Sequence, residues 1–202
     1  MRILPVGDRA LLVELDDLDS VMALAATLRA SPPPGVLDCV PAARTVLLKC
    51  DLDATSPVAV ADAVRDLRSS ARVSGPDEVI EIPASYDGPD IDEVSARASM
   101  TRQEFIEWHT TAHWQVAFCG FAPGFGYLVC PQARSFPRRD TPRTSVPAGS
   151  IGVAGEFTGI YPRASPGGWQ LIGRTPMSLF DLDAEPPALL RPGVGVRFVR
   201  DS

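Results

Sequence analysis

The placement of glycine and proline constrains the fold of this chain more than any other feature of its sequence. The chain contains 20 prolines and 16 glycines, and beyond His113 they divide the sequence into short apolar runs. Those runs are Trp114–Phe121, Ser150–Ala154, Trp169–Ile172, Met177–Phe180 and Val194–Val199. Many short strands separated by turn residues are typical of a β-barrel or a β-sandwich, so we expect one of these in the C-terminal part.

The first part of the chain instead alternates strand-like and helix-like segments. The expected strands are 9–15, 36–40, 45–50 and 78–83, and the expected helices are 21–29 and 57–72. Asp19 and Ser20 are suitable caps for the first helix, and Pro57 suits the first turn of the second. The order β-α-β-β-α-β is that of a ferredoxin-like domain. With two further helices expected at 90–98 and 101–111, the predicted fold class is α+β.

The composition excludes several classes of function. The net charge is −6 and the isoelectric point is about 4.9, whereas a nucleic-acid-binding domain is usually basic. The apolar runs are far shorter than a membrane span, and the apolar run within residues 1–5 is too short for a signal peptide. We therefore expect a cytoplasmic protein that binds neither nucleic acid nor a membrane.

Arginine is distributed unevenly along the chain. Residues 118–176 carry six arginines against two acidic residues, a local charge of +4, although the whole chain has a charge of −6. One interpretation is a solvated surface, and the other is a pocket in which arginine holds a carboxylate or a phosphate. Lys49 is the single lysine and no Gly-Lys-Ser/Thr sequence occurs, so the chain has no Walker A loop for a nucleotide.

The two histidines stand four residues apart, a spacing that is common in metal sites. On a helix His109 and His113 would share one face. A third ligand and an H-E-x-x-H pattern are missing, and the four cysteines form no C-x-x-C pair, so we predict no metal in this chain. His109 is then either a hydrogen-bonded structural residue or a general base, because neutral imidazole is available near pH 7.

Two loops of the C-terminal part combine glycine with residues that suit a binding site. The segment 120–128 contains Phe121 and Phe125, which can form pocket walls beside glycines that let a ligand approach the backbone. In the segment 146–155, Gly149, Ser150 and Gly152 are expected to lie in a β-turn whose exposed amides bind an anion.

Three further segments, 158–162, 165–169 and 172–176, place the polar residues Tyr161, Ser165 and Arg174 beside rigid turns. A serine nucleophile needs a base and an orienting carboxylate. His109 is the available base, but no G-x-S-x-G elbow is present. A self-sufficient serine hydrolase is therefore not expected.

At these residues the sequence resembles the family of 5-oxoprolinase B subunits, also described as the KipI family and as allophanate hydrolase subunit 1. The matching segments are Gly7–Leu11, His109, Gly120-Phe121, Pro123–Phe125, Tyr127-Leu128, Pro137–Arg139, Pro142-Arg143, Val146–Ser150, Gly155, Thr158–Pro162, Ser165–Trp169, Ile172–Pro176, Leu179–Asp181 and Pro192-Gly193. They cover nearly the whole chain and are densest between residues 118 and 181. The sequence departs from the family pattern at His113-Trp114, Val129-Cys130, Glu156-Phe157 and Val194.

The resemblance implies a small N-terminal α/β domain followed by a cyclophilin-like β-barrel. Combined with the pattern above, it predicts a ferredoxin-like domain over residues 1–82 and the barrel domain over residues 83–202. It also implies that the chain acts with the A and C subunits of 5-oxoprolinase in a complex that uses ATP to hydrolyse 5-oxo-L-proline to L-glutamate. The resemblance further implies that ATP acts through the assembly, and because the chain has no Walker A loop and no complete catalytic triad, we expect the chain alone to be inactive.

These considerations select the candidate site residues for a small lactam or amide substrate. The candidate catalytic residues are His109, Arg143, Ser165 and Arg174. The candidate substrate-binding residues are Phe121, Phe125, Arg138, Gly149, Ser150, Gly152, Tyr161 and Trp169. In the proposed chemistry, arginines would stabilise phosphate and backbone amides would stabilise a developing oxyanion.

Two other functions stay open at this point. The KipI name implies an inhibitor or binding module for a histidine kinase, which would need an exposed apolar patch. The family is also similar to part of the carboxyltransferase region of biotin-dependent urea carboxylase. A carboxyltransferase-like or allophanate hydrolase component would need partners, because the chain contains no biotin-carrier motif.

Overall fold

The structure is a computed structural model that describes residues 1–67, 76 and 78–201. The chain divides into two compact units, Met1–Gly75 and Pro76–Ser202. Among the described residues, buried apolar side chains form one cluster in the N-terminal unit and two clusters in the C-terminal unit. Across the residues that the structure describes, no helix combines the length and the apolar character needed to cross a membrane.

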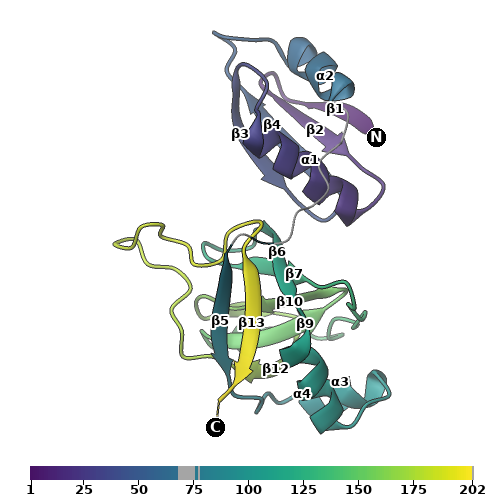
Figure 1. The fold of residues 1–202 in the computed structure, drawn as a ribbon, viewed down its shortest axis with the longest axis vertical. Helices are drawn as coiled ribbons and strands as arrows, with labels where there is room; N and C mark the ends of the chain where they lie inside the picture. The colour runs from purple at the N-terminus through teal and green to yellow at the C-terminus, as the bar shows by residue number, and fades with distance from the viewer. Residues whose placement is uncertain (68–75, 77, 202) are drawn as a thin grey trace. The chain divides into compact units, whose positions relative to one another are not determined.

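The N-terminal unit is a four-stranded antiparallel sheet with two helices (Figure 1). In sequence order its elements are β1 (Arg2–Val6), β2 (Ala10–Glu14), α1 (Leu18–Ala30), β3 (Val36–Pro41), β4 (Thr45–Cys50) and α2 (Pro57–Asp66). Alternate residues of the central strands, such as Val13 and Leu48, are fully buried and pack with Leu28 of α1 and Val60 of α2. Both helices therefore cover the same face of the sheet, because alternate strand residues point to one side.

Local sequence signals explain the ends of these helices. Asp17, rather than the expected Asp19 or Ser20, caps α1 by accepting a hydrogen bond from the Ser20 amide. Ser56 caps α2 in the same way, and Pro57 occupies the first helical turn as expected. Helix α2 ends at Asp66, and residues 68–72 of the longer helix that we expected lie outside the described residues.

The ferredoxin-like strand order is not confirmed. The expected last strand, 78–83, forms β5 (Val79–Ala84), which pairs with a strand of the C-terminal unit. Its expected position beside β2 is filled by β1, which the sequence analysis missed. A turn of three residues joins β1 to β2, and Gly7 adopts a positive φ of 59° there. Because this connection is short, the pairing of β1 with β2 costs little chain entropy. Strand β4 still lies between β2 and β3, which is a split βαβ arrangement.

The C-terminal unit is built on a seven-stranded sheet that closes almost completely into a barrel. In the order in which they pair, its strands are β12 (Gln170–Arg174), β9 (Ser150–Ala154), β10 (Phe157–Ile160), β7 (Gly126–Val129), β6 (Trp114–Cys119), β13 (Gly195–Arg200) and β5. Strands β13 and β5 lie side by side and are parallel (Figure 1). The α+β class and the barrel-like sheet agree with the sequence analysis, whereas the expected strand at 177–180 is reduced to a single bridge between Phe180 and Ala188.

Residues 85–90, here called the closing segment, join the two edges of this sheet. Ser85 and Arg174 exchange two backbone hydrogen bonds of 2.9 Å. Further along, the Gly88 amide donates to the Ile172 carbonyl at 3.2 Å, and the Asp90 amide donates to the Leu171 carbonyl at 3.0 Å. The closing segment continues directly from β5 and runs along β12, so it satisfies backbone groups at an edge that would otherwise be open.

Two helices and a small two-stranded sheet complete the C-terminal unit. Helices α3 (Ile91–Arg97) and α4 (Arg102–Thr111) follow the closing segment, as the sequence predicts. Thr101 and Glu104 form a capping box at the start of α4, and Phe105, Ile106 and His109 of that helix are buried. Strands β8 (Arg143–Val146) and β11 (Ser165–Gly167) form a separate two-stranded sheet.

We predict that Gly173→Ala destabilises the C-terminal unit by about 1–3 kcal/mol, because a Cβ there would overpack the seam between the closing segment and β12. An added Cβ would lie 2.3 Å from the Ser85 carbonyl oxygen. All three tryptophans belong to this unit, so urea unfolding followed by tryptophan fluorescence reports on it. As a matched control, Gly120→Ala places its Cβ 3.6 Å from the Tyr127 ring and should change stability by no more than about 0.5 kcal/mol. Equal effects of the two substitutions would contradict the prediction.

Candidate functional site

Asp90 holds two arginines of the positively charged segment in place. Its Oδ1 accepts hydrogen bonds from Arg139 at 3.0 Å and from Arg143 at 2.8 Å, and its Oδ2 accepts one from the Leu171 amide at 2.6 Å. Asp90 is 5% exposed and stands at the start of α3, yet its carboxylate makes no capping hydrogen bond to that helix. The carboxylate instead fixes two guanidinium groups, and charge-assisted hydrogen bonds of this kind are the strong ones.

Arg143 and Arg174 lie at a pocket of about 500 Å³, here called the arginine–serine pocket. The lining residues are Asp87, Gly88, Pro89, Arg143, Ser145, Pro147, Ala148, Ser150, Leu171, Gly173 and Arg174. Arg174 forms an exposed ion pair of 2.9 Å with Asp87. The Nη1 of Arg143 is buried and has no hydrogen-bond partner among the described residues. A buried donor of this kind is suited to an oxygen of an anionic ligand.

A second, smaller cavity of about 110 Å³, here called the aromatic pocket, collects five of the candidate residues. It is lined by Phe121, Phe125, Tyr127, Arg138, Tyr161, Gly167, Gly168 and Trp169. The rings meet edge to face, with centroid separations of 5.4 Å for Phe125–Trp169 and 5.5 Å for Phe125–Tyr161. This geometry is the preferred one for aromatic pairs and keeps the walls rigid.

Phe121 stands at the aromatic pocket in an unusual backbone conformation. It has a φ of +66° and is 59% exposed, although its ring contacts those of Phe125 and Tyr161. A large side chain at positive φ is strained by about 1–3 kcal/mol, and such residues cluster at functional sites. The turn is held by hydrogen bonds from the Phe125 amide to the Ala122 carbonyl and from the Gly120 amide to the Phe125 carbonyl.

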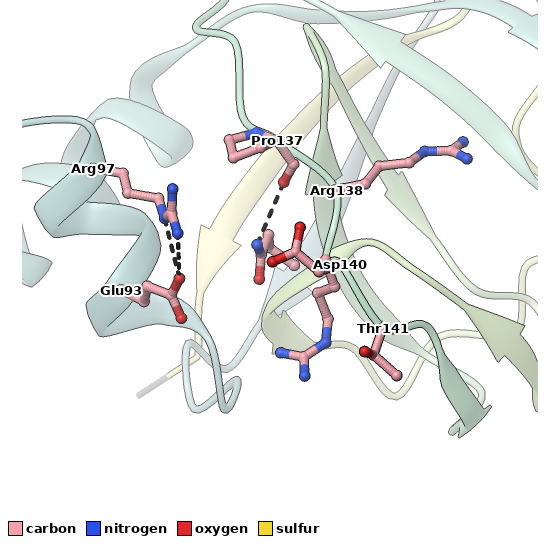
Figure 2. Close-up of a pocket in the computed structure, with 8 residues that line it drawn as sticks. Glu93, Arg97, Pro137, Arg138, Asp140 and Thr141 are labelled. Atoms are coloured by element: carbon pink, nitrogen blue, oxygen red, sulfur yellow. Dashed lines mark hydrogen bonds and ion pairs between the residues drawn. The ribbon is translucent and has the colours of Figure 1, made fainter.

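Arg138 lines both the aromatic pocket and a neighbouring polar pocket. A polar pocket of about 420 Å³ lies between α3 and residues 137–141, and Figure 2 shows Arg138 directed away from Glu93 and Arg97 there. Burial raises the pKa values of Tyr127 and Tyr161, and the positive charge of Arg138 partly opposes this rise in both phenols. The guanidinium forms no hydrogen bond or ion pair within the described part of the chain.

His109 lies outside the three pockets and is fully buried. Its Nδ1 is 2.7 Å from the Tyr86 hydroxyl and its Nε2 is 3.2 Å from the Thr158 hydroxyl, while the Phe198 ring packs against it at 4.4 Å. Burial lowers the pKa of His109 to about 3 and raises the pKa of Tyr86. A neutral ring satisfies both contacts when one nitrogen donates and the other accepts, so the geometry is that of a structural histidine rather than a general base.

The other candidates have structural duties that the sequence analysis did not foresee. The anion-binding turn expected at 149–155 is not formed, because the Gly149 amide donates to Tyr161 and the Gly155 amide donates to Phe136. Gly152 leaves room for Trp169, since an added Cβ would lie 3.2 Å from the Cβ of that residue. The hydroxyl of Ser165 is buried without a partner among the described residues, and His109 contacts Tyr86 and Thr158, so Ser165 and His109 do not form a pair.

Asp90, which holds Arg139 and Arg143, and Tyr127, which lines the aromatic pocket, were not selected by the sequence analysis. Asp90 stands where a helix is expected to start, and only contacts with residues 49, 53 and 81 positions away reveal its role. Tyr127 could have been found, because it follows Phe125 by two residues along an extended chain and so points to the same side. Over the described residues, no group of three or more His, Cys, Asp or Glu side chains is arranged to hold a metal ion.

Comparison with known proteins places these features in a family. Residues 1–190 match the family described as "Carboxyltransferase domain, subdomain C and D". The chain is 36% identical to the 5-oxoprolinase B subunit of Bacillus subtilis (strain 168), across 98% of this chain and 91% of that protein. It is 42% identical to the 5-oxoprolinase B subunit of Escherichia coli O157:H7, across 82% of this chain and 78% of that protein.

Solved structures support the same relationship. The crystal structure of TTHA0988 is similar with a TM-score of 0.79 and 35% identity over 96% of this chain, which spans 40% of that longer chain. The urea carboxylase of Kluyveromyces lactis is similar with a TM-score of 0.73 over 99% of this chain and 22% of that protein. At 19% identity, the second match indicates a shared fold only.

We predict that His109 makes the C-terminal unit acid-sensitive. The pKa of His109 in the folded state lies below the ordinary value of 6.5, so the unfolded state binds a proton before the folded state does as the pH falls. The contribution of the neutral ring to the free energy of unfolding is therefore complete above about pH 6.5 and is lost as the pH falls toward about 3. Between about pH 7 and about pH 5 the parent chain should lose about 2 kcal/mol more stability than His109→Gln, at about 1.4 kcal/mol per pH unit.

The matched control for this prediction is His113→Gln, since His113 is the other histidine and is exposed. The acid sensitivity assigned to His109 should remain in this variant, as measured by urea unfolding followed by tryptophan fluorescence. A second measurement does not depend on the fold of the variant: the imidazole resonances of His109 in the native protein should not titrate down to about pH 5. Titration near the ordinary value would refute the assignment.

Proposed function

This chain belongs to the family of 5-oxoprolinase B subunits, and on that basis we propose that it is a subunit of an ATP-dependent complex that hydrolyses 5-oxo-L-proline to L-glutamate. The family relationship extends over 98% of the chain in the Bacillus subtilis relative and over residues 1–190 in the family match. The proposed partners are the A and C subunits of the same complex, and ATP acts through the assembly. The proposed location is the cytoplasm.

The observation that supports this function best is the arginine–serine pocket. A lactam is a stable amide, and phosphorylation of its carbonyl oxygen makes ring opening by water feasible. Stabilising such a phosphoryl group requires fixed cations. Arg143, held by Asp90 with a free Nη1, and Arg174 provide two guanidinium groups at a cavity of about 500 Å³, a volume within the usual range for ligand pockets.

Other features of the chain argue against catalytic activity of the chain alone. Ser165 lacks a base, His109 is sealed in the core with both ring nitrogens engaged, and the sequence has no Walker A loop. These features fit a subunit that contributes binding groups while nucleotide binding depends on its partners. We expect the cyclophilin-like barrel to be the part that contributes those groups.

A second candidate is a carboxyltransferase-like component, and the description of the matching family favours it. In that case the arginine–serine pocket would hold a carboxylate or carbonate-like group rather than a phosphoryl group, and the partners would carry biotin. The two functions differ in a product that can be measured, because only the first forms L-glutamate from 5-oxo-L-proline.

The decisive experiment is reconstitution of the full chain with the A and C subunits encoded in the same organism. We expect ATP-dependent formation of glutamate from 5-oxo-L-proline by the complex and none by this chain alone. Glutamate formation by the single chain, or complete inactivity of a stable three-subunit complex, would reject the proposed function. Biotin-dependent carboxylation by an assembly containing this chain would favour the second candidate.

Within that complex, we predict that Arg174→Ala lowers activity about 10- to 150-fold, because a charged hydrogen-bond donor contributes about 1.5–3 kcal/mol. The ion pair with Asp87 is exposed, so its loss should change the stability of the chain by no more than about 1 kcal/mol. Arg163→Ala is the matched control, since Arg163 is exposed and lies outside both pockets. Unchanged activity of Arg174→Ala beside an unchanged melting temperature would remove Arg174 from the site.

A further inference from the structure

The aromatic pocket differs from the arginine–serine pocket in chemistry and in size. Its walls are the rings of Phe125, Tyr127, Tyr161 and Trp169, and its charged lining residue is Arg138. A cavity of about 110 Å³ has room for roughly four water molecules at about 30 Å³ each. A nucleotide or a peptide side chain with its backbone is too large for it, whereas a single five-membered ring is of suitable size.

Arg138 is the available charge at this pocket. Arg139 and Arg143 are committed to Asp90, and Arg174 is paired with Asp87. Arg138 forms no ion pair or hydrogen bond with any described residue, and it points away from Glu93 (Figure 2). A guanidinium group that lines a cavity with aromatic walls and has no partner among the described residues suits a ligand with a carboxylate and a small apolar body, because arginine binds carboxylates in a bidentate manner.

The walls of the pocket are held in place by a locally strained backbone. Phe121 keeps a φ of +66° while its exposed ring contacts Phe125 and Tyr161. Gly167 also lines the pocket, and a Cβ added to it would lie 2.3 Å from the Tyr161 hydroxyl oxygen, so only glycine allows that approach. Both features keep the cavity open at a defined size, which simple core packing would not require.

We propose that the aromatic pocket binds the small ring acid that the complex consumes, with the ring against the aromatic walls and the carboxylate on Arg138. The class of ligand follows from the pocket itself, while its identity as 5-oxo-L-proline rests on the proposed function.

The test uses the full chain with nitrogen-15 in its tryptophans, whose three indole N–H signals can be followed separately by NMR. The indoles of Trp108 and Trp114 donate to the carbonyls of Gln132 and His109, whereas Trp169 lines the pocket. We expect 5-oxo-L-proline and cyclopentanecarboxylate to shift the Trp169 signal alone. 2-Pyrrolidinone, which keeps the lactam ring but lacks the carboxylate, should bind at least about tenfold more weakly.

Two variants complete the design. Arg138→Ala should weaken binding of both acids at least about tenfold and leave binding of 2-pyrrolidinone unchanged, and Arg163→Ala should behave as the parent chain. The pocket assignment is overturned if millimolar acid does not shift the Trp169 signal, or if the acids bind Arg138→Ala as tightly as they bind the parent chain. Either result counts against the pocket even if the reconstituted complex is active. If acid binding depends on Arg138 but the reconstituted complex forms no glutamate, the pocket assignment is supported and the proposed function is rejected.

Discussion

The carboxylate of Asp90 is the interaction on which the C-terminal unit depends. One oxygen holds Arg139 and Arg143, and the other accepts the Leu171 amide, so a single buried charge connects the closing segment, the loop before β8 and strand β12. Two guanidinium groups against one carboxylate leave a local excess of positive charge. That excess is tolerated because the arginines are partly exposed, and a buried carboxylate without these partners would be strongly destabilising.

How much of the fold could be predicted depended on the range of the interactions. Helix α4, with its Thr101–Glu104 capping box, and the hairpin of β3 and β4 follow from neighbouring residues, so the sequence pattern predicted them well. Strand β5 was recognised as a strand but assigned to the wrong sheet, because its partner β13 is more than a hundred residues away. An apolar run indicates that a strand forms, and tertiary packing decides where it pairs.

The same distinction holds for the candidate site. Phe121, Phe125, Arg138, Tyr161 and Trp169 were selected by residue type beside rigid turns, and the structure brings them to one cavity. His109 was selected for its chemistry, but burial removes the proton affinity that a base needs. Its place in the core could not be deduced from the sequence of α4 alone, because the groups that surround it come from β6, β10 and β13.

The position of β13 within the barrel also has a consequence for biosynthesis. This strand lies between β6 and β5 in the sheet, although nearly all of the C-terminal unit precedes it in the sequence. During translation, β5 and β6 therefore leave the ribosome without their shared neighbour, each with one row of backbone groups unpaired. Such unpaired edges favour association with other chains until residues 195–200 emerge and fill the gap.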